Sequence, residues 1–340
     1  MKLSDFDYNL PPERIAQTPV EPRDSSRLLV LDRKTGALQH AEFSELIRFL
    51  HPGDLLVINQ TRVLPARLYA RKIPTGGKVE LLLLNQREPT LWEGLVGGKR
   101  IQRATKLSLP EGLTAEVEAE LDGPRRLLRF NRPIEGLLEQ IGQMPLPPYI
   151  HERLQNQERY QTVYAQETGS AAAPTAGLHF TPGLLHAVQE AGIGIAEVTL
   201  HVGLDTFAPV TEEDVTQHQI HTEWCSLSPQ AAQKINQTKR SGGRVVAVGT
   251  TSVRTLETAG NRAGGPGQVV PFQGATDLYI LPGYSFKVVD VMITNFHLPR
   301  STLLMLVSAF ASQTAILHAY QVAIEQEYRF YSFGDAMLIL

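Results

Sequence analysis

The sequence of 340 residues has very little of what marks secreted, membrane and metal-cluster proteins. It contains one cysteine, Cys225, so the chain by itself cannot form an internal disulfide, a thiolate zinc site or an iron–sulfur cluster. The longest apolar stretch, residues 303–311, includes a serine and is too short to cross a bilayer. No apolar run of signal-peptide length opens the chain. We therefore expect a cytoplasmic protein without a membrane segment.

Several ligand-binding signatures are also missing. The sequence has neither the Gly-rich dinucleotide fingerprint nor the lysine of a phosphate-binding P-loop, which disfavours a nucleoside triphosphate. Histidines and acids gather in His218-Gln219-Ile220-His221-Thr222-Glu223, but the two-histidine helical zinc motif is absent. We expect no metal.

Charge is distributed unevenly along the chain. The formal net charge is −3, yet residues 61–106 hold ten basic residues against three glutamates, an excess of seven positive charges. Such an excess suits a surface that binds a polyanion, although a solvated basic surface fits equally well. Within this stretch Arg67, Tyr69 and Arg71 alternate as on one face of a strand, so that cations flank a ring able to stack on a base.

Two patterns of apolar and polar residues alternate along the chain and predict two domains. Residues 55–58 form a continuous apolar run, typical of a strand covered on both faces, and after residue 148 helical and strand patterns alternate. Residues 115–121 alternate strictly between apolar residues and glutamate, as in a half-buried antiparallel strand. We predict an α/β domain with helices packed over a sheet, built from residues 1–67 and 149–340. A small antiparallel β-barrel of residues 68–148 interrupts it.

Four polar clusters between apolar segments are candidates for chemistry. The first, residues 169–180, is a run of small residues that ends in His179; a tight structural loop is the plain alternative. The second combines His201 with residues 218–223. If residues 218–223 form a strand, His221 and Glu223 share one face of it and could form an oriented acid–base pair. All of these lie next to apolar segments, where α/β proteins place their ligands.

The other two clusters lie at predicted strand-to-helix turns. Residues 249–254, Gly-Thr-Thr-Ser-Val-Arg, offer free backbone N–H groups and hydroxyls to a carboxylate or phosphate, with ordinary helix capping as the alternative. Thr294-Asn295-Phe296-His297 ends an apolar strand, and residues 301–310 then repeat apolar side chains at helical spacing.

Taken together, these motifs closely resemble one family, the S-adenosylmethionine:tRNA ribosyltransferase-isomerases of queuosine biosynthesis, nearly from end to end. The similar blocks are Asp5-Phe6-Asp7-Tyr8, Arg23-Asp24-Ser25-Ser26-Arg27-Leu28, Pro52-Gly53-Asp54, Leu146-Pro147-Pro148-Tyr149-Ile150, Arg159-Tyr160-Gln161-Thr162-Val163-Tyr164, Ala173-Pro174-Thr175-Ala176-Gly177-Leu178-His179-Phe180, Gly249-Thr250-Thr251-Ser252 and Thr294-Asn295-Phe296-His297-Leu298-Pro299. The chain departs from the family pattern at Asp205, where glycine is usual, and at Ile220, where methionine is usual. A loop that needs the backbone conformation of glycine at position 205 would have to differ here, next to His201 and Thr206.

The resemblance implies a reaction. The ribosyl group of S-adenosylmethionine is transferred to 7-aminomethyl-7-deazaguanine at the wobble position of tRNA and isomerised, which gives epoxyqueuosine and releases adenine and methionine. S-adenosylmethionine is then a substrate, no further cofactor is implied, and the family suggests a monomer. Two alternatives stay open: a tRNA methyltransferase that uses S-adenosylmethionine, and a non-catalytic RNA-binding protein.

We assign roles to residues on this basis. The predicted acid–base residues are His179, His221, Glu223 and His297. The predicted contacts to S-adenosylmethionine are Thr175, Gly177, His201, Thr250, Thr251, Arg254 and Asn295. The predicted contacts to tRNA are Arg62, Arg67, Tyr69, Arg71, Lys72, Lys99 and Arg100.

Overall fold

The computed structural model describes residues 1–152, 154–203 and 210–340, so Asp205 and Thr206 lie outside the described residues. The chain divides into two compact units. The first comprises residues 1–62, 148–167 and 173–340, and the second comprises residues 63–147 and 168–172. The division therefore falls a few residues before the predicted start at residue 68, and a short return segment joins the second unit.

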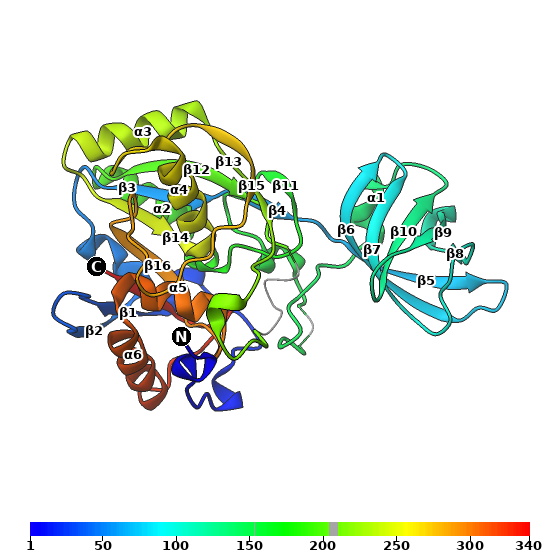
Figure 1. Cartoon of the computed structure of the whole chain (residues 1–340), viewed down its shortest axis with the longest axis horizontal. Coiled ribbons are helices and arrows are strands. Elements are labelled where there is room, and N and C mark those ends of the chain that lie inside the picture. The colour runs from blue at the N-terminus through cyan, green and yellow to red at the C-terminus, as the bar shows by residue number, and fades with distance from the viewer. Residues whose placement is uncertain (153, 204–209) are drawn as a thin grey trace. The chain divides into compact units, whose positions relative to one another are not determined.

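A nine-stranded mixed sheet forms the centre of the first unit (Figure 1). Its strands in spatial order are β15 (Phe272–Thr276), β13 (Glu223–Leu227), β12 (Gly194–Leu200), β3 (Leu55–Asn59), β14 (Val245–Val248), β16 (Val291–Asn295), β17 (Ala336–Ile339), β1 (Arg27–Leu31) and β2 (Leu38–Glu42). The neighbours β12, β3, β14 and β16 run parallel. β17 is antiparallel to β16 and parallel to β1. The apolar run in β3 is buried at every position, as expected for a strand covered on both faces.

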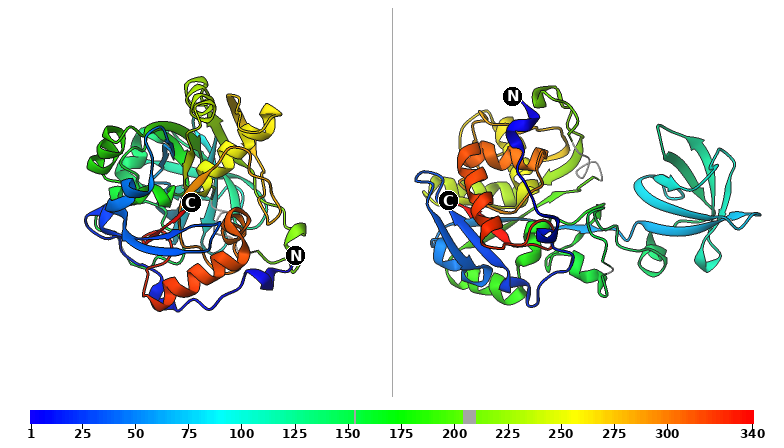
Figure 2. Two further views of the ribbon diagram at one scale, coloured as in Figure 1. Left: turned by 90° about the vertical axis from the view of Figure 1, so that its left-hand side faces the viewer. Right: turned by 90° about the horizontal axis from the view of Figure 1, so that it is seen from below.

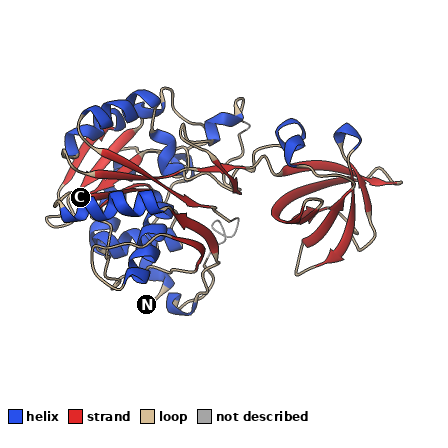
Figure 3. Cartoon of the chain, turned by 90° about the horizontal axis from the view of Figure 1, so that it is seen from above, coloured by secondary structure: helices blue, strands red, loops and turns tan. Residues whose placement is uncertain are grey.

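Helices pack on both faces of this sheet, as Figure 3 shows. They are α2 (Pro182–Glu190), α3 (Pro229–Arg240), α4 (Gly249–Ala263), α5 (Thr302–Ala311) and α6 (Gln313–Glu325). Short 3-10 turns complete the unit: η1 (Leu3–Phe6), η2 (Pro12–Arg14), η3 (Arg23–Ser25), η4 (Phe43–Phe49), η6 (Gln157–Tyr160), η7 (Thr175–His179) and η9 (Val215–Gln217). α2 and η4 bury side chains in one core cluster with the sheet residues Leu56, Ile58 and Val248.

The helix boundaries follow local capping chemistry. Thr181, Ser228 and Ser301 each accept a hydrogen bond from a backbone N–H in the first turn of α2, α3 and α5, respectively. Proline occupies the first position of α2 and α3, where its missing N–H costs nothing. The N-terminal segment lies beside α6, because Gln313 donates to the carbonyl of Asp5 (Figure 2).

The second unit is a closed antiparallel barrel with the strand order β10-β7-β6-β5-β8-β9. These strands are β5 (Arg67–Ile73), β6 (Lys78–Glu88), β7 (Leu91–Gly97), β8 (Lys106–Ser108), β9 (Thr114–Glu120) and β10 (Arg125–Phe130). The turn η5 (Pro110–Gly112) connects β8 to β9, and helix α1 (Glu135–Ile141) follows β10. The strands β4 (Thr61–Val63) and β11 (Glu167–Ser170) form a separate two-stranded sheet. The glutamates of β9 alternate with buried Ala115 and Val117, as their spacing predicts.

The predicted fold class is confirmed: an α/β unit whose chain is interrupted by a small antiparallel barrel. Among the described residues no single helix is long and apolar enough to span a membrane, and only α5 and α6 together, which are bent by 113°, reach that length and composition.

Candidate active site at the carboxyl edge of the sheet

The carboxyl ends of the four parallel strands bring the predicted polar clusters to one edge. β3 ends at Asn59, β12 leads into His201, β14 leads into Gly249, and β16 ends at Asn295. The carboxyl ends of parallel strands lie at the same edge of the sheet, which is where α/β proteins bind ligands. Segments far apart in the sequence therefore contribute to one region.

A buried network surrounds His179. Its Nδ1 lies 2.7 Å from Oγ of Ser26, which directly precedes β1, and its Nε2 lies 3.2 Å from Nδ2 of Asn295. Asn295 Nδ2 also donates to the carbonyl of Tyr331, and Oδ1 of Asn295 accepts from Thr175 at 3.2 Å. Because Asn295 presents its donor, Nε2 of His179 must accept and Nδ1 must carry the proton. His179 thus connects two predicted site segments, residues 169–180 and 294–297, with Ser26.

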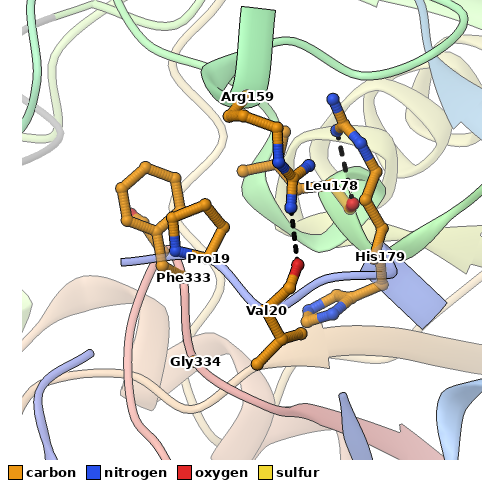
Figure 4. Close-up of a pocket in the computed structure, with 9 residues that line it drawn as sticks. Pro19, Val20, Arg159, Leu178, His179, Phe333 and Gly334 are labelled. Atoms are coloured by element: carbon orange, nitrogen blue, oxygen red, sulfur yellow. Dashed lines mark hydrogen bonds between the residues drawn. The ribbon is translucent and has the colours of Figure 1, made fainter. Parts of the chain in front are cut away.

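The surroundings of His179 keep its ring neutral at physiological pH. Burial, with the charges of Arg329 and Arg23 adding to it, lowers the pKa of His179 to about 3. The ring also stacks on Phe43 at a centroid distance of 5.0 Å. A cavity of about 20 Å³ is lined by Val20, Arg159 and His179, among other residues (Figure 4). That volume suits a single water molecule.

A second network joins His221, Glu223 and Arg254. Nε2 of His221 lies 3.3 Å from Oε1 of Glu223, which also accepts from the backbone N–H of Gly203 at 3.0 Å. Nη1 of Arg254 donates to Oε2 of Glu223, and its Nε donates to the carbonyl of Leu278. Burial alone would raise the pKa of Glu223, but its bond with His221 and the charge of Arg254 hold that pKa below its ordinary value. Half-buried His221 is therefore oriented by a buried carboxylate that stays ionised.

Asn59 links the ends of β3, β12 and α4. Its Nδ2 donates to the carbonyl of Leu200 at 3.0 Å and to Oγ1 of Thr251 at 3.1 Å, while its Oδ1 accepts from the backbone of Thr61 and Leu200. Nδ1 of His201 lies 2.8 Å from Oγ1 of Thr61. Thr251 and His201, two predicted contacts to S-adenosylmethionine, are thus fixed by the same asparagine–threonine turn.

His297 lies apart from these networks. Its Nε2 is 2.8 Å from Oγ1 of Thr294, its backbone N–H donates to the hydroxyl of Tyr320 at 2.9 Å, and its carbonyl accepts from Tyr8. Burial lowers the pKa of His297 to about 3. The hydrogen bonds of His297 do not include His179, His221 or Glu223.

Small residues allow η7 to approach its neighbours closely. A Cβ on Gly177 would meet the Tyr164 hydroxyl oxygen at 2.1 Å and Cγ2 of Thr162 at 2.8 Å. Gly249 has φ +84° and packs against Ala176 of η7. Thr250, in the first turn of α4, is buried, and the N-cap residue Val248 has no side chain that could satisfy the N-terminal N–H groups.

The predicted RNA contacts are divided between surface positions and ion pairs. Tyr69 and Arg71 are exposed on β5, and Arg67 shares their face but pairs with Glu80 at 2.9 Å. Arg62 belongs to the α/β unit and pairs with Glu158 at 2.7 Å. In the barrel a hollow of about 590 Å³ is lined by the cations Lys72, Lys99, Arg100 and Lys106, together with Ile73, Thr75, Ala104 and Thr105.

The site includes residues to which the sequence analysis gave no role: Ser26, Asn59, Thr61, Tyr320 and Trp224, whose ring stacks on that of His201. Asn59 and Thr61 could have been found, because a polar pair directly after a fully apolar strand signals a functional edge. Ser26 and Tyr320 carried no such signal, since their partners lie 153 and 23 residues away in the chain. Among the described residues no group of three or more histidine, cysteine or acidic side chains lies close enough to hold a metal.

Comparisons with known proteins cover the whole chain. Residues 3–339 match the model of a family described as "Queuosine biosynthesis protein". The chain is 55% identical over 344 residues to an S-adenosylmethionine:tRNA ribosyltransferase-isomerase from Desulfitobacterium hafniense, and 56% identical over 344 residues to one from Symbiobacterium thermophilum, with 100% of each chain covered. The crystal structure of S-adenosylmethionine tRNA ribosyltransferase from Thermotoga maritima is similar with a TM-score of 0.58 and 41% identity, covering 99% of this chain and 100% of that one.

Proposed function

Because the chain belongs to the S-adenosylmethionine:tRNA ribosyltransferase-isomerase family, enzymes of queuosine biosynthesis, we propose that it transfers the ribosyl group of S-adenosylmethionine to tRNA and isomerises it. The acceptor is the aminomethyl group of 7-aminomethyl-7-deazaguanine at the wobble position. The products are epoxyqueuosine in tRNA, adenine and methionine. We further expect the enzyme to act as a cytoplasmic monomer.

The observation that best supports this proposal is the pairing of half-buried His221 with buried, ionised Glu223 at the carboxyl edge of the sheet. A histidine oriented by a carboxylate is a competent general base near neutral pH. The sulfonium charge of S-adenosylmethionine acidifies the adjacent 5′ carbon, so His221 can remove a proton from it. The electron pair then drives opening of the sugar and departure of adenine.

The later steps need no oxidant or reductant. The acceptor amine adds to C4′ of the opened sugar and loses a proton. The resulting carbanion at C5′ attacks the C1′ aldehyde and closes the five-carbon ring, and the alkoxide formed at C1′ then displaces methionine from C5′ as the epoxide closes. His179 and His297 are both held neutral. We propose that they act by hydrogen bonding around the substrate, His179 by orienting Asn295 and Thr175.

The methionine carboxylate has a suitable place at the start of α4. The first-turn N–H groups of α4 have no side-chain cap, and Thr250 lies among them. Nη2 of Arg254 is buried without a hydrogen-bond partner among the described residues. An ionised carboxylate would satisfy both the donor and the helix N-terminus. We propose that Thr250, Thr251 and Arg254 bind it, while Gly177 and His201 contact the rest of S-adenosylmethionine.

The transfer can be tested with tRNA that carries the aminomethyl base and S-adenosylmethionine labelled either in the ribose or in the methyl group. We expect ribose label to enter the tRNA with equimolar release of adenine and methionine. Entry of methyl label, with S-adenosylhomocysteine as product, would establish the methyltransferase alternative instead. Binding of tRNA with neither label transferred would support the non-catalytic RNA-binding alternative.

The proposed base is tested by the variant His221→Ala. General-base catalysis contributes about 10²–10⁴-fold to a rate, so adenine release should fall by about that factor. His186→Ala, on the exposed face of α2, removes a histidine whose ion pair is with Glu190 and not with a site residue, and is the matched control. Near-normal adenine release by the His221 variant would remove this residue from the mechanism.

A further inference from the structure

Trp224 is an exposed large side chain in a strand that is otherwise mostly buried. It lies in β13 between buried Glu223 and Cys225, and 42% of its surface remains exposed. Single exposed apolar residues are common on proteins and need no function. The position and support of this indole, however, distinguish it from a solitary surface residue.

The indole is held by a stack of fixed geometry. Its ring lies 5.0 Å from that of His201, and the two planes differ by only 16°. His201 in turn is oriented by the 2.8 Å contact between its Nδ1 and Oγ1 of buried Thr61. Burial lowers the pKa of His201, so its ring carries no charge at neutral pH. The tryptophan therefore has one face covered by a rigid neutral ring.

The same stack lies at the edge where the candidate catalytic residues meet. The backbone N–H of His201 donates to the carbonyl of Trp224 at 2.9 Å, at the carboxyl end of β12. Glu223, the carboxylate that orients His221, is the adjacent residue in β13. Successive residues of a strand point to opposite faces, so Trp224 and Glu223 flank this edge from the two faces of the sheet.

We propose that the exposed face of Trp224 is a stacking site for a purine-type nucleobase of the substrates. This inference depends on the proposed function, which supplies two such rings: the adenine of S-adenosylmethionine and the deazaguanine of the tRNA. An uncharged indole that is already stacked on one side matches the flat, apolar face of such a base. Among the described residues His201 is the one aromatic ring that packs against Trp224, and 42% of the surface of this side chain is exposed.

Fluorine NMR can test the proposal on the wild-type sequence, with 5-fluorotryptophan incorporated in place of tryptophan. The chain has two tryptophans, and the other, Trp92, is buried in the barrel. The variant Trp224→Phe assigns the two signals. Titration with S-adenosylhomocysteine, which has adenine but no sulfonium, should shift the Trp224 signal if adenine stacks there. Titration with tRNA carrying the aminomethyl base should shift it if the tRNA base does.

The binding constants of variants give an independent measure. Trp224→Leu should weaken binding of the ligand that shifts the signal by about tenfold or more, whereas Trp224→Phe should retain most of the affinity, because base–aromatic stacking depends on the ring. Ser226→Ala, two residues along the same face of β13, is the matched control and should bind as the wild type does. Circular dichroism establishes that each variant is folded.

The proposal is overturned if neither ligand shifts the Trp224 signal at saturation, or if Trp224→Leu binds both ligands as tightly as the wild type does. Its failure is distinct from failure of the proposed function, since ribose transfer to tRNA is measured separately. A shift with S-adenosylhomocysteine in a chain that transfers no ribose would support the stacking site and reject the reaction.

Discussion

At the scale of single residues, three histidines of the candidate site differ in environment and therefore in chemistry. His221 is half-buried and bonded to an ionised carboxylate, whereas His179 and His297 are buried and their side chains bond to uncharged groups. Burial disfavours the imidazolium form, so the pKa values of His179 and His297 fall to about 3. These environments are the reason why we propose His221 as a base and His179 and His297 as fixed hydrogen-bonding groups.

We predict that the two buried histidines make the α/β unit sensitive to acid. Their folded pKa values of about 3 lie below the value of about 6.5 in an unfolded chain, so between these pH values the unfolded state binds more protons. Their contribution to stability is present above pH 6.5 and is lost as the pH falls toward 3. Each histidine should cost up to about 1.4 kcal/mol of unfolding free energy per pH unit in this window.

Urea unfolding between pH 6.5 and pH 5 measures this effect, because most carboxylates stay ionised there. His179→Gln should reduce the pH slope of the unfolding free energy by roughly the share of one histidine. His186→Gln, which alters an exposed side chain, should leave the slope unchanged. An unaltered slope in the His179 variant would mean that His179 is not held neutral.

At the scale of elements, the short turn η7 depends on a close approach that only glycine permits. Gly177 leaves no room for a Cβ beside Tyr164 and Thr162, and η7 carries His179 and Thr175 toward Asn295. The position of this turn therefore determines the geometry of the first network. Sequence alone marked the small residues of this run but not the side chains they approach.

We predict that Gly177→Ala destabilises the protein by about 1–3 kcal/mol, the usual cost of overpacking a core. Gly183→Ala is the matched control in α2, because its Cβ would meet nothing closer than Oγ1 of Thr181 at 3.9 Å. At that helical position alanine should be neutral or stabilising by up to about 1 kcal/mol. Equal unfolding free energies for the two variants would show that the approach of η7 is not tight.

At the scale of the whole molecule, the proposed catalytic residues and the proposed tRNA contact lie in different units. The candidate catalytic residues belong to the α/β unit, whereas the hollow with Lys72, Lys99 and Arg100 belongs to the barrel. A polyanion bound by the barrel would release counterions, so its affinity must fall as salt rises. We propose that this hollow is part of the contact with tRNA.

We predict that the double variant Lys99→Ala/Arg100→Ala binds tRNA more weakly and with a shallower salt dependence. Each lost phosphate contact should reduce the slope of log K against log salt by about 0.7–0.9. Arg240→Ala, at the exposed end of α3 in the α/β unit, removes a positive charge elsewhere and should have little effect. Filter binding over a series of salt concentrations gives both slopes, and identical slopes for the double variant and the wild type would place the RNA contact elsewhere.

The sequence by itself determined the elements and the fold class. The continuous apolar run of β3 predicted a strand covered on both faces, the alternation in β9 predicted a half-buried antiparallel strand, and prolines and hydroxyl caps marked the starts of α2 and α3. These features are local, because side-chain periodicity and capping act within a few residues. The pairing of His221 with Glu223 was also predictable, since the two residues are neighbours in the chain.

Only the tertiary structure decided how the site is connected. Ser26, His179 and Asn295 are each separated by more than a hundred residues along the chain, and the packing of η7 against the ends of β1 and β16 brings them within hydrogen-bonding distance. Whether a histidine titrates near neutral pH depends on the burial that packing imposes, which no local pattern encodes. For the same reason the exposed indole of Trp224 became a candidate binding surface only when β12 and β13 placed it on His201 at the edge of the sheet.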